Sequence, residues 1–435
     1  MPMLPASCRI HALALLLGLL AAQPALQGAS SHEGMKEIKL NGATVWLGKP
    51  IEVTKQIGWG QQWAHNEAEP SWSFIHLTPY LDRFPNGNLI VTYAMDPDTQ
   101  VNPICLSAFQ ISTDQGRTWG RRNTVVMQHN PLIFLPGKHD SLLGIPSEFT
   151  RLSPEEPSTY VAPAYLFEHG GKKMVMIPDG MKILDWKWPV ATNPGVQPED
   201  SWHVGITVTG SALTEGSRVL ATGHSFTRGQ LAQERMFHNV IFASEDGGYT
   251  WRYYSTVSEF DPAFRGQPGY EGPNESYMIR LADGDLMNVF RVGGGEHWKL
   301  HRSYSHDGGK TWSPADILPA WSVRPAVLRL SNGTIALTTG RPGIYLWVAT
   351  DPRATQWQQV DLMAYHNEWA PEAALKIGSF MRANQKRYET TSYTGLAETS
   401  PNHLVMVYDR DPERPPTGPK DLSHVYVLPI EIERQ

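Results

Sequence analysis

Residues 112–119 read Ser-Thr-Asp-Gln-Gly-Arg-Thr-Trp, and the pattern Ser-x-Asp-x-Gly-x-Thr-Trp recurs without a mismatch at residues 244–251 and 305–312. A degenerate copy of the pattern lies at residues 351–357. In each copy the Asp side chain is suited to accept backbone N–H bonds across a hairpin turn, the Gly supplies a positive φ, and the Trp is expected to plug between neighbouring sheets. The pattern therefore predicts repeated β-hairpins and assigns these residues to the scaffold.

The spacing of the copies gives the length of the repeat. The aspartates stand at positions 114, 246 and 307, so one interval is 61 residues and the other is about twice as long, as though one copy were missing. A second mark, a turn flanked by apolar alternation, lies at residues 84–91, 281–287 and 330–337. With weaker turns, these marks predict six units that start near residues 75, 144, 200, 274, 322 and 388.

A unit of this length with four strands is typical of one blade of a β-propeller. We therefore expect an all-β fold, a six-bladed β-propeller of four-stranded antiparallel blades. A free early strand at residues 38–47 and an apolar run at residues 425–430 are expected to pair within one blade and close the ring. The alternative is seven blades, with residues 38–70 in an extra unit.

Composition agrees with this fold class and excludes several others. The chain has 435 residues, with 38 Gly, 34 Pro and 15 Trp but only 18% charged residues, which excludes a disordered chain, a coiled coil and a polytopic membrane protein. The net charge of −6 leaves no basic footprint for nucleic acid. An anionic substrate would have to be held by a local cluster of arginines.

The N-terminus carries the signs of a secretory signal peptide. An apolar run at residues 12–22 follows Arg9 and His11 and precedes the small residues 28–30, and it is too short to span a bilayer. We expect residues 1–29 to be the signal and residues 30–435 a single β-propeller catalytic domain, secreted or periplasmic and monomeric. Cleavage would leave Cys105 as the one cysteine, so no intramolecular disulfide is expected.

The innermost strands of a propeller line a central channel, so one rim of that channel collects a side chain from every blade. Polar residues expected at the starts of these strands are His76, Glu148, His203, Glu275, Arg324 and Tyr393. The strands that follow end near Asp96 and Asp98, His224, Arg291, Arg341, and Asp409 and Arg410. Arg291 and Arg341 stand at similar distances past the turns of successive blades, so we expect both in one pocket. The histidines show no H-x-x-x-H spacing, and neither a metal nor another cofactor is expected.

The octapeptides resemble the Asp-box or BNR repeats of the sialidase superfamily, and the repeats span nearly the whole chain after the signal. Residues 274–291 (NESYMIRLADGDLMNVFR) are similar to the sialidase segment that holds the glutamate activating the nucleophile and one of three substrate-binding arginines. Residues 392–397 (SYTGLA) resemble the family's late tyrosine segment.

This resemblance implies a role for each matching residue. Tyr393 would be the nucleophile, Glu275 its partner, and Asp98, or else Asp96, the acid/base. Arg291 and Arg341 would be two members of the arginine triad. Where the family has its first arginine, at the start of blade one, this sequence has His76, so His76 or another arginine takes that contact or the substrate is not a standard sialoside. Arg324 and His224 are further candidates for substrate binding.

Elementary chemistry agrees with these roles. A sialic acid carries a carboxylate on its anomeric carbon, so a carboxylate nucleophile would meet like-charge repulsion, whereas a phenol activated by a neighbouring Glu would not. Guanidinium groups bind a carboxylate bidentately and stay charged at every relevant pH. The sequence thus favours a secreted, sialidase-like exo-glycosidase that cleaves a terminal carboxylated sugar with retention.

Two other functions, and the role of one aromatic stretch, stay open at this point. The chain could be a propeller lyase or hydrolase of uronic-acid polysaccharides, in which His76, His203 or His224 acts with a Tyr. It could be a glycan-binding propeller without catalysis, in which Glu275 and Arg291 form a structural ion pair and Tyr393 only lines the channel. The aromatic stretch at residues 186–189 could stack on sugars or serve blade packing.

Overall fold

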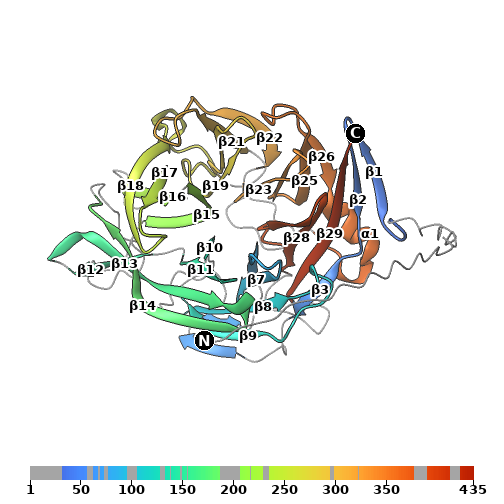
Figure 1. The fold of residues 1–435 in the computed structure, drawn as a ribbon, viewed down its shortest axis with the longest axis horizontal. Helices are drawn as coiled ribbons and strands as arrows, with labels where there is room; N and C mark the ends of the chain where they lie inside the picture. The colour runs from blue at the N-terminus through green and yellow to red at the C-terminus, as the bar shows by residue number, and fades with distance from the viewer. Residues whose placement is uncertain are drawn as a thin grey trace, which may run out of the picture. The chain divides into compact units, whose positions relative to one another are not determined.

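Antiparallel four-stranded sheets repeat along the chain in the computed structural model (Figure 1). Blade one contains β6 (Leu77–Arg83), β7 (Leu89–Ala94), β8 (Cys105–Ser112) and β9 (Asn123–Met127). Blade four contains β19 (Ser276–Arg280), β20 (Leu286–Phe290), β21 (Lys299–Ser305) and β22 (Asp316–Trp321). Blade five contains β23 (Ala326–Arg329), β24 (Ile335–Gly340), β25 (Ile344–Ala349) and β26 (Gln358–Asp361).

Blades two and three are joined into one nine-stranded sheet. Blade two contains β10 (Ile133–Pro136), β11 (Leu142–Ile145), β13 (Glu156–Glu168) and β14 (Lys173–Leu184), with β12 (Thr150–Ser153) paired to β13. Blade three contains β15 (Ile206–Glu215), β16 (Arg218–Arg228), β17 (Arg235–Ser244) and β18 (Thr250–Ser258). The two outer strands, β14 and β18, pair in parallel at Lys182–Thr250 to Leu184–Arg252.

Blade six is built from both ends of the chain. Its strands β27 (Gly395–Ser400), β28 (His403–Arg410) and β29 (His424–Arg434) are followed in the sheet by β2 (Ala43–Leu47) and β1 (Lys36–Leu40), and β3 (Ile51–Lys55) also pairs with β29. The register of β2 on β29 runs from Ala43–Arg434 to Leu47–Ile430. Because residues 36–55 join the last blade, the prediction of ring closure and of six blades is confirmed, and the seven-blade alternative is wrong.

The remaining elements are short. They are a two-stranded sheet of β4 (Gln62–Asn66) and β5 (Glu69–Trp72), the helix α1 (Leu362–Trp369), and the 3-10 turns His169–Gly171, Pro262–Phe264 and Pro371–Ala373. In the part of the chain that the structure describes, no helix has the length and apolar character needed to cross a membrane.

The structure describes residues 32–55, 62–66, 69–72, 77–95, 105–127, 133–137, 139–146, 149–153, 155–186, 206–215, 217–228, 235–293, 298–321, 323–376, 389–411 and 422–435. The chain divides into residues 1–34 and residues 35–435, and the propeller belongs to the second part. The predicted signal peptide lies outside the described residues and stays a prediction.

The Asp boxes have the geometry that their sequence predicts. Asp114, Asp246 and Asp307 each accept the N–H of the Thr four residues later at 2.8–2.9 Å and its hydroxyl at 2.6 Å. Asp351 in the degenerate copy accepts the same two groups of Thr355 at 2.8 and 3.0 Å. Trp251 is fully buried in a core shared by blades two and three, as expected of a plug between sheets.

Blade two begins earlier than predicted. Its first strand is β10, which starts at Ile133, whereas we expected the blade to start near residue 144. The turn between β10 and β11 has Gly137, His139 and Asp140 in place of an Asn-Gly or Asp-Gly pair, so the hairpin signal that marks other blades is missing there. The turn at Glu168 therefore lies between the third and fourth strands of the blade, not between the first and second.

The blades stack through their inner strands, which contact one another in the order β10, β15, β19, β23, β27 and β6. β7 and β20 are buried at every position, as required of strands covered on both faces by neighbouring sheets. Between blades three and four the approach is closest at Gly210, with φ +87°, where a Cβ atom would lie 1.5 Å from the carbonyl oxygen of Ser276.

We predict that Gly210→Ala lowers the free energy of unfolding by about 3 kcal/mol or more, because the methyl group forces β15 away from β19. Gly284→Ala is the matched control, since Gly284 has φ +95° with nothing within 4 Å of the added Cβ. The control measures backbone strain alone, about 1 kcal/mol. Urea unfolding of both variants checks this, and equal losses would show that the close approach is unimportant.

Candidate active site

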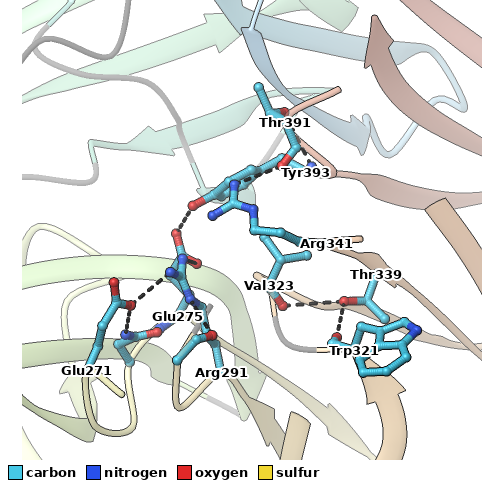
Figure 2. Close-up of polar contacts among 11 residues, drawn as sticks. Glu271, Glu275, Arg291, Trp321, Val323, Thr339, Arg341, Thr391 and Tyr393 are labelled. Carbon is cyan, nitrogen blue, oxygen red and sulfur yellow. Dashed lines mark hydrogen bonds and ion pairs between the residues drawn. The ribbon is translucent and has the colours of Figure 1, made fainter. Parts of the chain in front are cut away.

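All six innermost strands line one cavity along the axis of the ring. Its wall includes Tyr80 of β6, Ile133 of β10, Gly210 of β15, Tyr277 of β19, Ala326 of β23 and Leu396 of β27. The inner strands all run in the same direction, so residues just before them meet at one rim, together with residues at the ends of the second strands. This topology places Glu275, Arg291, Arg341 and Tyr393 together, as the sequence predicts (Figure 2).

Tyr393 and Glu275 form the centre of the site. The Tyr393 phenol donates a short hydrogen bond to Oε1 of Glu275, and Oε2 of Glu275 accepts from Nη1 of Arg291 at 2.8 Å. Figure 2 shows the hydroxyl of Tyr393 pointing at the carboxylate. The two residues come from blades six and four, so the contact bridges two blades that blade five separates.

Glu271 is part of the same cluster and had no role in the sequence prediction. It accepts from Nη2 of Arg291 at 2.8 Å and from the side-chain amide of Asn274 at 3.2 Å. Nε of Arg291 donates to the carbonyl of Gly293 at 3.1 Å. Arg291 is thus held between two carboxylates and fixes Glu275 in place. Glu271 lies in an irregular segment before β19, where no periodicity marks it.

The charges of this cluster set its protonation. Burial disfavours the ionised form of Glu275, but the charge of Arg291, the hydrogen bonds from Tyr393 and Arg291, and the charge of Arg341 together hold its pKa below the ordinary value. Burial, and next the charge of Glu275, raise the pKa of Tyr393, against the opposing charges of Arg291 and Arg341. At neutral pH Tyr393 is therefore a neutral phenol and Glu275 an ionised carboxylate, and the phenol proton points at the carboxylate oxygen.

Arg341 lies beside the Tyr393 ring. Its Nη2 donates to the carbonyl of Thr391 at 2.9 Å, and its guanidinium carbon is 5.5 Å from the centroid of the ring. Its backbone has φ +61°, a conformation that non-glycine residues adopt rarely and that is often found at functional sites. Arg341 thus lies at the Tyr393 ring, while Arg291 bonds the Glu275 carboxylate that the phenol meets (Figure 2), and a common pocket for the two arginines stays a prediction.

Arg324 brings a third cation to the site. Its side chain leaves blade five and ends against blade one, where the guanidinium lies 3.2 Å from the centroid of the Tyr80 ring and donates to the carbonyls of Pro79 at 3.3 Å and Thr394 at 2.9 Å. It is also 5.1 Å from the centroid of the Tyr393 ring. The residue is only 2% exposed, and among the described residues no carboxylate forms an ion pair with it. Burial lowers its pKa to about 9, so it stays charged at neutral pH.

The segment that carries Arg324 is anchored by Thr339 at the end of β24. The Thr339 hydroxyl lies 2.9 Å from the carbonyl oxygen of Trp321 and 3.4 Å from that of Val323 (Figure 2). The same strand end leads into Arg341, so a single turn of blade five places both arginines.

Other predicted site residues are not brought into this cluster by the described structure. Asp98, Asp96, His76, His203 and Glu148 lie outside the described residues, and their roles stay predictions. His224 is buried on β16, with its ring packed edge-to-face on Phe237 at 5.0 Å. Trp186 is buried against Phe242, so blade packing is its role, while residues 187–189 are not described.

A further carboxyl group lies deeper in the cavity. Asp82 follows Tyr80 by two positions on β6 and therefore points to the same face, about 7 Å further along the channel. Burial, opposed by the backbone N–H of Arg83, raises the pKa of Asp82 to about 7. Tyr277 also lines the cavity, and its pKa is raised by burial and then by the charge of Asp82.

Comparison with known proteins identifies the repeat and the fold. Residues 185–370 match the model of the BNR repeat-like domain. No curated protein matches the sequence. The predicted resemblance to the Asp-box propellers of the sialidase superfamily is confirmed for the repeats and the fold.

Several solved structures share this fold. A protein of unknown function from Dyadobacter fermentans is 16% identical, with a TM-score of 0.59 over 91% of this chain and 100% of that one. A Hadza microbial sialidase is 14% identical, with a TM-score of 0.52 over 83% of this chain and 66% of that one. An alpha-L-arabinanase of Penicillium chrysogenum, complexed with arabinobiose, is 13% identical, with a TM-score of 0.53 over 88% and 98%. At these identities the likeness shows the fold that the chain shares with such glycosidases.

The partly buried carboxyl group of Asp82 in the channel predicts an unusual pH dependence of stability. Because the pKa of Asp82 is raised on folding, its stabilising effect is full below pH 4 and is lost as pH rises through about 7. We expect the stability gain of Asp82→Asn over wild type to grow by roughly 2 to 4 kcal/mol between pH 4 and pH 8, measured by chemical unfolding.

Asp283→Asn is the control of opposite sign. The hydrogen bond from Arg353 leads the causes that lower the pKa of Asp283. Wild type should therefore lose stability relative to this variant as pH falls below about 4, and the difference should be nearly constant between pH 4 and pH 8. Parallel pH profiles for wild type and Asp82→Asn would contradict the prediction.

Proposed function

We propose that this chain is a retaining exo-glycosidase that releases a terminal carboxylated sugar, such as a sialic acid, through Tyr393. The observation that carries the proposal is the hydrogen bond from the Tyr393 phenol to Glu275, whose other oxygen is held by Arg291. A phenol whose proton already points at an ionised carboxylate can lose that proton as its oxygen attacks carbon, so the pair is suited to nucleophilic catalysis.

In the first step Oη of Tyr393 attacks the anomeric carbon and its proton passes to Glu275. The bond from that carbon to the leaving oxygen breaks, and a carboxylic acid gives the oxygen a proton. We assign this acid to Asp98 from the sequence resemblance. In the second step water attacks the same carbon, its proton goes to the acid residue, and the departing phenolate recovers its proton from Glu275. Two inversions give net retention.

A carboxylated substrate fits the charges around Tyr393. Arg291 already bonds two protein carboxylates, so its positive charge and remaining N–H groups assist while its main task is to hold Glu275. Arg341 and Arg324 flank the Tyr393 ring. Nε and Nη1 of Arg324 have no hydrogen-bond partner among the described residues. We assign recognition of the substrate carboxylate to these two arginines.

The site favours this proposal over the alternatives from the sequence. A uronate lyase or hydrolase needs a His facing a Tyr, whereas the partner of the Tyr393 hydroxyl is a carboxylate. A propeller that only binds glycans has no need for a buried, ionised Glu aligned with a phenol. We further propose, from residues 1–29, that the enzyme acts outside the cytoplasm.

The test is hydrolysis of a fluorogenic α-sialoside by the purified chain. We expect Tyr393→Phe and Glu275→Gln each to lower kcat/KM at least about 100-fold, because each removes half of the nucleophilic pair. Tyr165→Phe is the matched control: Tyr165 is also buried, with a pKa raised to about 12 by burial, but it lies in the core between blades one and two. Retention is checked by proton NMR of the first-formed anomer.

A neutral arabinoside, tested in parallel, decides the substrate class. Turnover of the arabinoside without turnover of the sialoside would contradict recognition of a carboxylated sugar. Equal activity of Tyr393→Phe and wild type on the sialoside would contradict the tyrosine nucleophile.

A further inference from the structure

Asp409, near the end of β28, is a buried carboxylate for which the sequence suggested no role. It is 0% exposed and accepts four hydrogen bonds. Oδ1 accepts from the Thr390 hydroxyl and the Thr391 N–H, both at 2.8 Å. Oδ2 accepts from the Thr78 N–H at 3.0 Å and, in a short contact, from the Thr391 hydroxyl. The donors come from blade one and from the segment that leads into Tyr393.

The two threonine hydroxyls relay these bonds to the backbone of the nucleophile. An ionised carboxylate only accepts, so each hydroxyl must point its proton at Asp409 and turn a lone pair elsewhere. The Thr390 hydroxyl accepts the N–H of Ser392 at 3.0 Å, and the Thr391 hydroxyl accepts the N–H of Tyr393 at 3.3 Å. Asp409 thus fixes the direction of two hydrogen-bond chains that end on Ser392 and Tyr393.

The backbone that these chains hold is strained. Ser392 has φ +62° and Thr78 has φ +50°, and a β-branched residue in this region is a true outlier. Such strained conformations persist where contacts with the surrounding residues hold the backbone in place. Asp409 bonds the N–H of Thr78 directly and that of Ser392 through one hydroxyl, so it holds both strained residues.

We propose that Asp409 is the positioning residue of Tyr393: it locks the 390–393 segment against blade one so that the phenol meets Glu275. The carbonyl of Thr391 also accepts from Arg341, so the same lock fixes the position of that arginine relative to the ring. The expected effect of Asp409 on turnover rests on the function proposed above, whereas its effect on the position of Tyr393 does not.

Asp409→Asn tests the lock with little change in shape. An amide offers one acceptor oxygen, and its NH2 group would face a backbone N–H on either side, because Thr391 N–H and Thr78 N–H approach opposite oxygens. We expect kcat on the sialoside to fall about 30-fold or more, with KM changed less than about threefold, since misplacement of a reacting group by about 1 Å has effects of this size.

The second readout needs no substrate. In protein labelled with 3-fluorotyrosine, the 19F resonance of Tyr393 is identified by its loss in Tyr393→Phe. We expect this resonance to shift or broaden in Asp409→Asn. If wild type does not cleave the sialoside, the proposed function fails while the resonance still decides the positioning role.

Asp246→Asn is the matched control. Asp246 also accepts a threonine N–H and hydroxyl, but in the Asp box of blade three. This variant should lose stability without changing kcat or the Tyr393 resonance. If Asp409→Asn does not fold, Thr391→Val removes one relay hydroxyl and should shift the same resonance. An unchanged resonance in the folded Asp409→Asn or Thr391→Val variant would overturn the proposal.

Discussion

The pairing of β2 with β29 is the constraint on which the site depends. It completes blade six with residues from the start of the chain and leaves the last blade packed against the first, where Leu89 and Val91 of β7 share a core with Val405 and Val407 of β28. That packing brings Thr78 of blade one within reach of Asp409 and Pro79 within reach of Arg324. Without β2 and β3, blade six would have three strands and an open outer edge at β29, which weakens the sheet that carries Tyr393 and Asp409.

The ring also explains why opposite charges concentrate at one rim. Each blade contributes the start of its first strand and the end of its second, so residues far apart in sequence become neighbours without any local motif. Around Tyr393 this brings Arg291, Arg324 and Arg341 together with Glu271 and Glu275. The arrangement is unequal: Arg291 is neutralised by two carboxylates, while Arg324 is buried without an acidic partner among the described residues. A buried cation of this kind is unfavourable in isolation and becomes favourable when an anion arrives.

The sequence was most informative where local chemistry repeats. The Asp boxes and Asn-Gly or Asp-Gly turns predicted six blades, and the match of residues 274–291 and 392–397 to family segments predicted the Tyr393–Glu275 pair. It was least informative where a contact depends on another blade. Glu271 lies in an irregular segment, and Asp409 looks like an ordinary strand end until the partner blade is known. The start of blade two was placed wrongly because its first turn lacks the usual residues.

Arg324 illustrates how such a ring can place a charge from one blade against another blade. The expected first arginine is absent from the start of blade one, and a guanidinium from blade five lies there instead, on the Tyr80 ring and the Pro79 carbonyl. The place of a charged side chain around the propeller axis, rather than its place in the sequence, decides which charge a ligand contacts. A long side chain can reach beyond its own blade, so a charge at one place around the axis can come from a different strand. Because Arg324 is almost fully buried and lines the cavity, its charge acts in a low-dielectric setting, where one cation has more effect on an anionic group than it would in water.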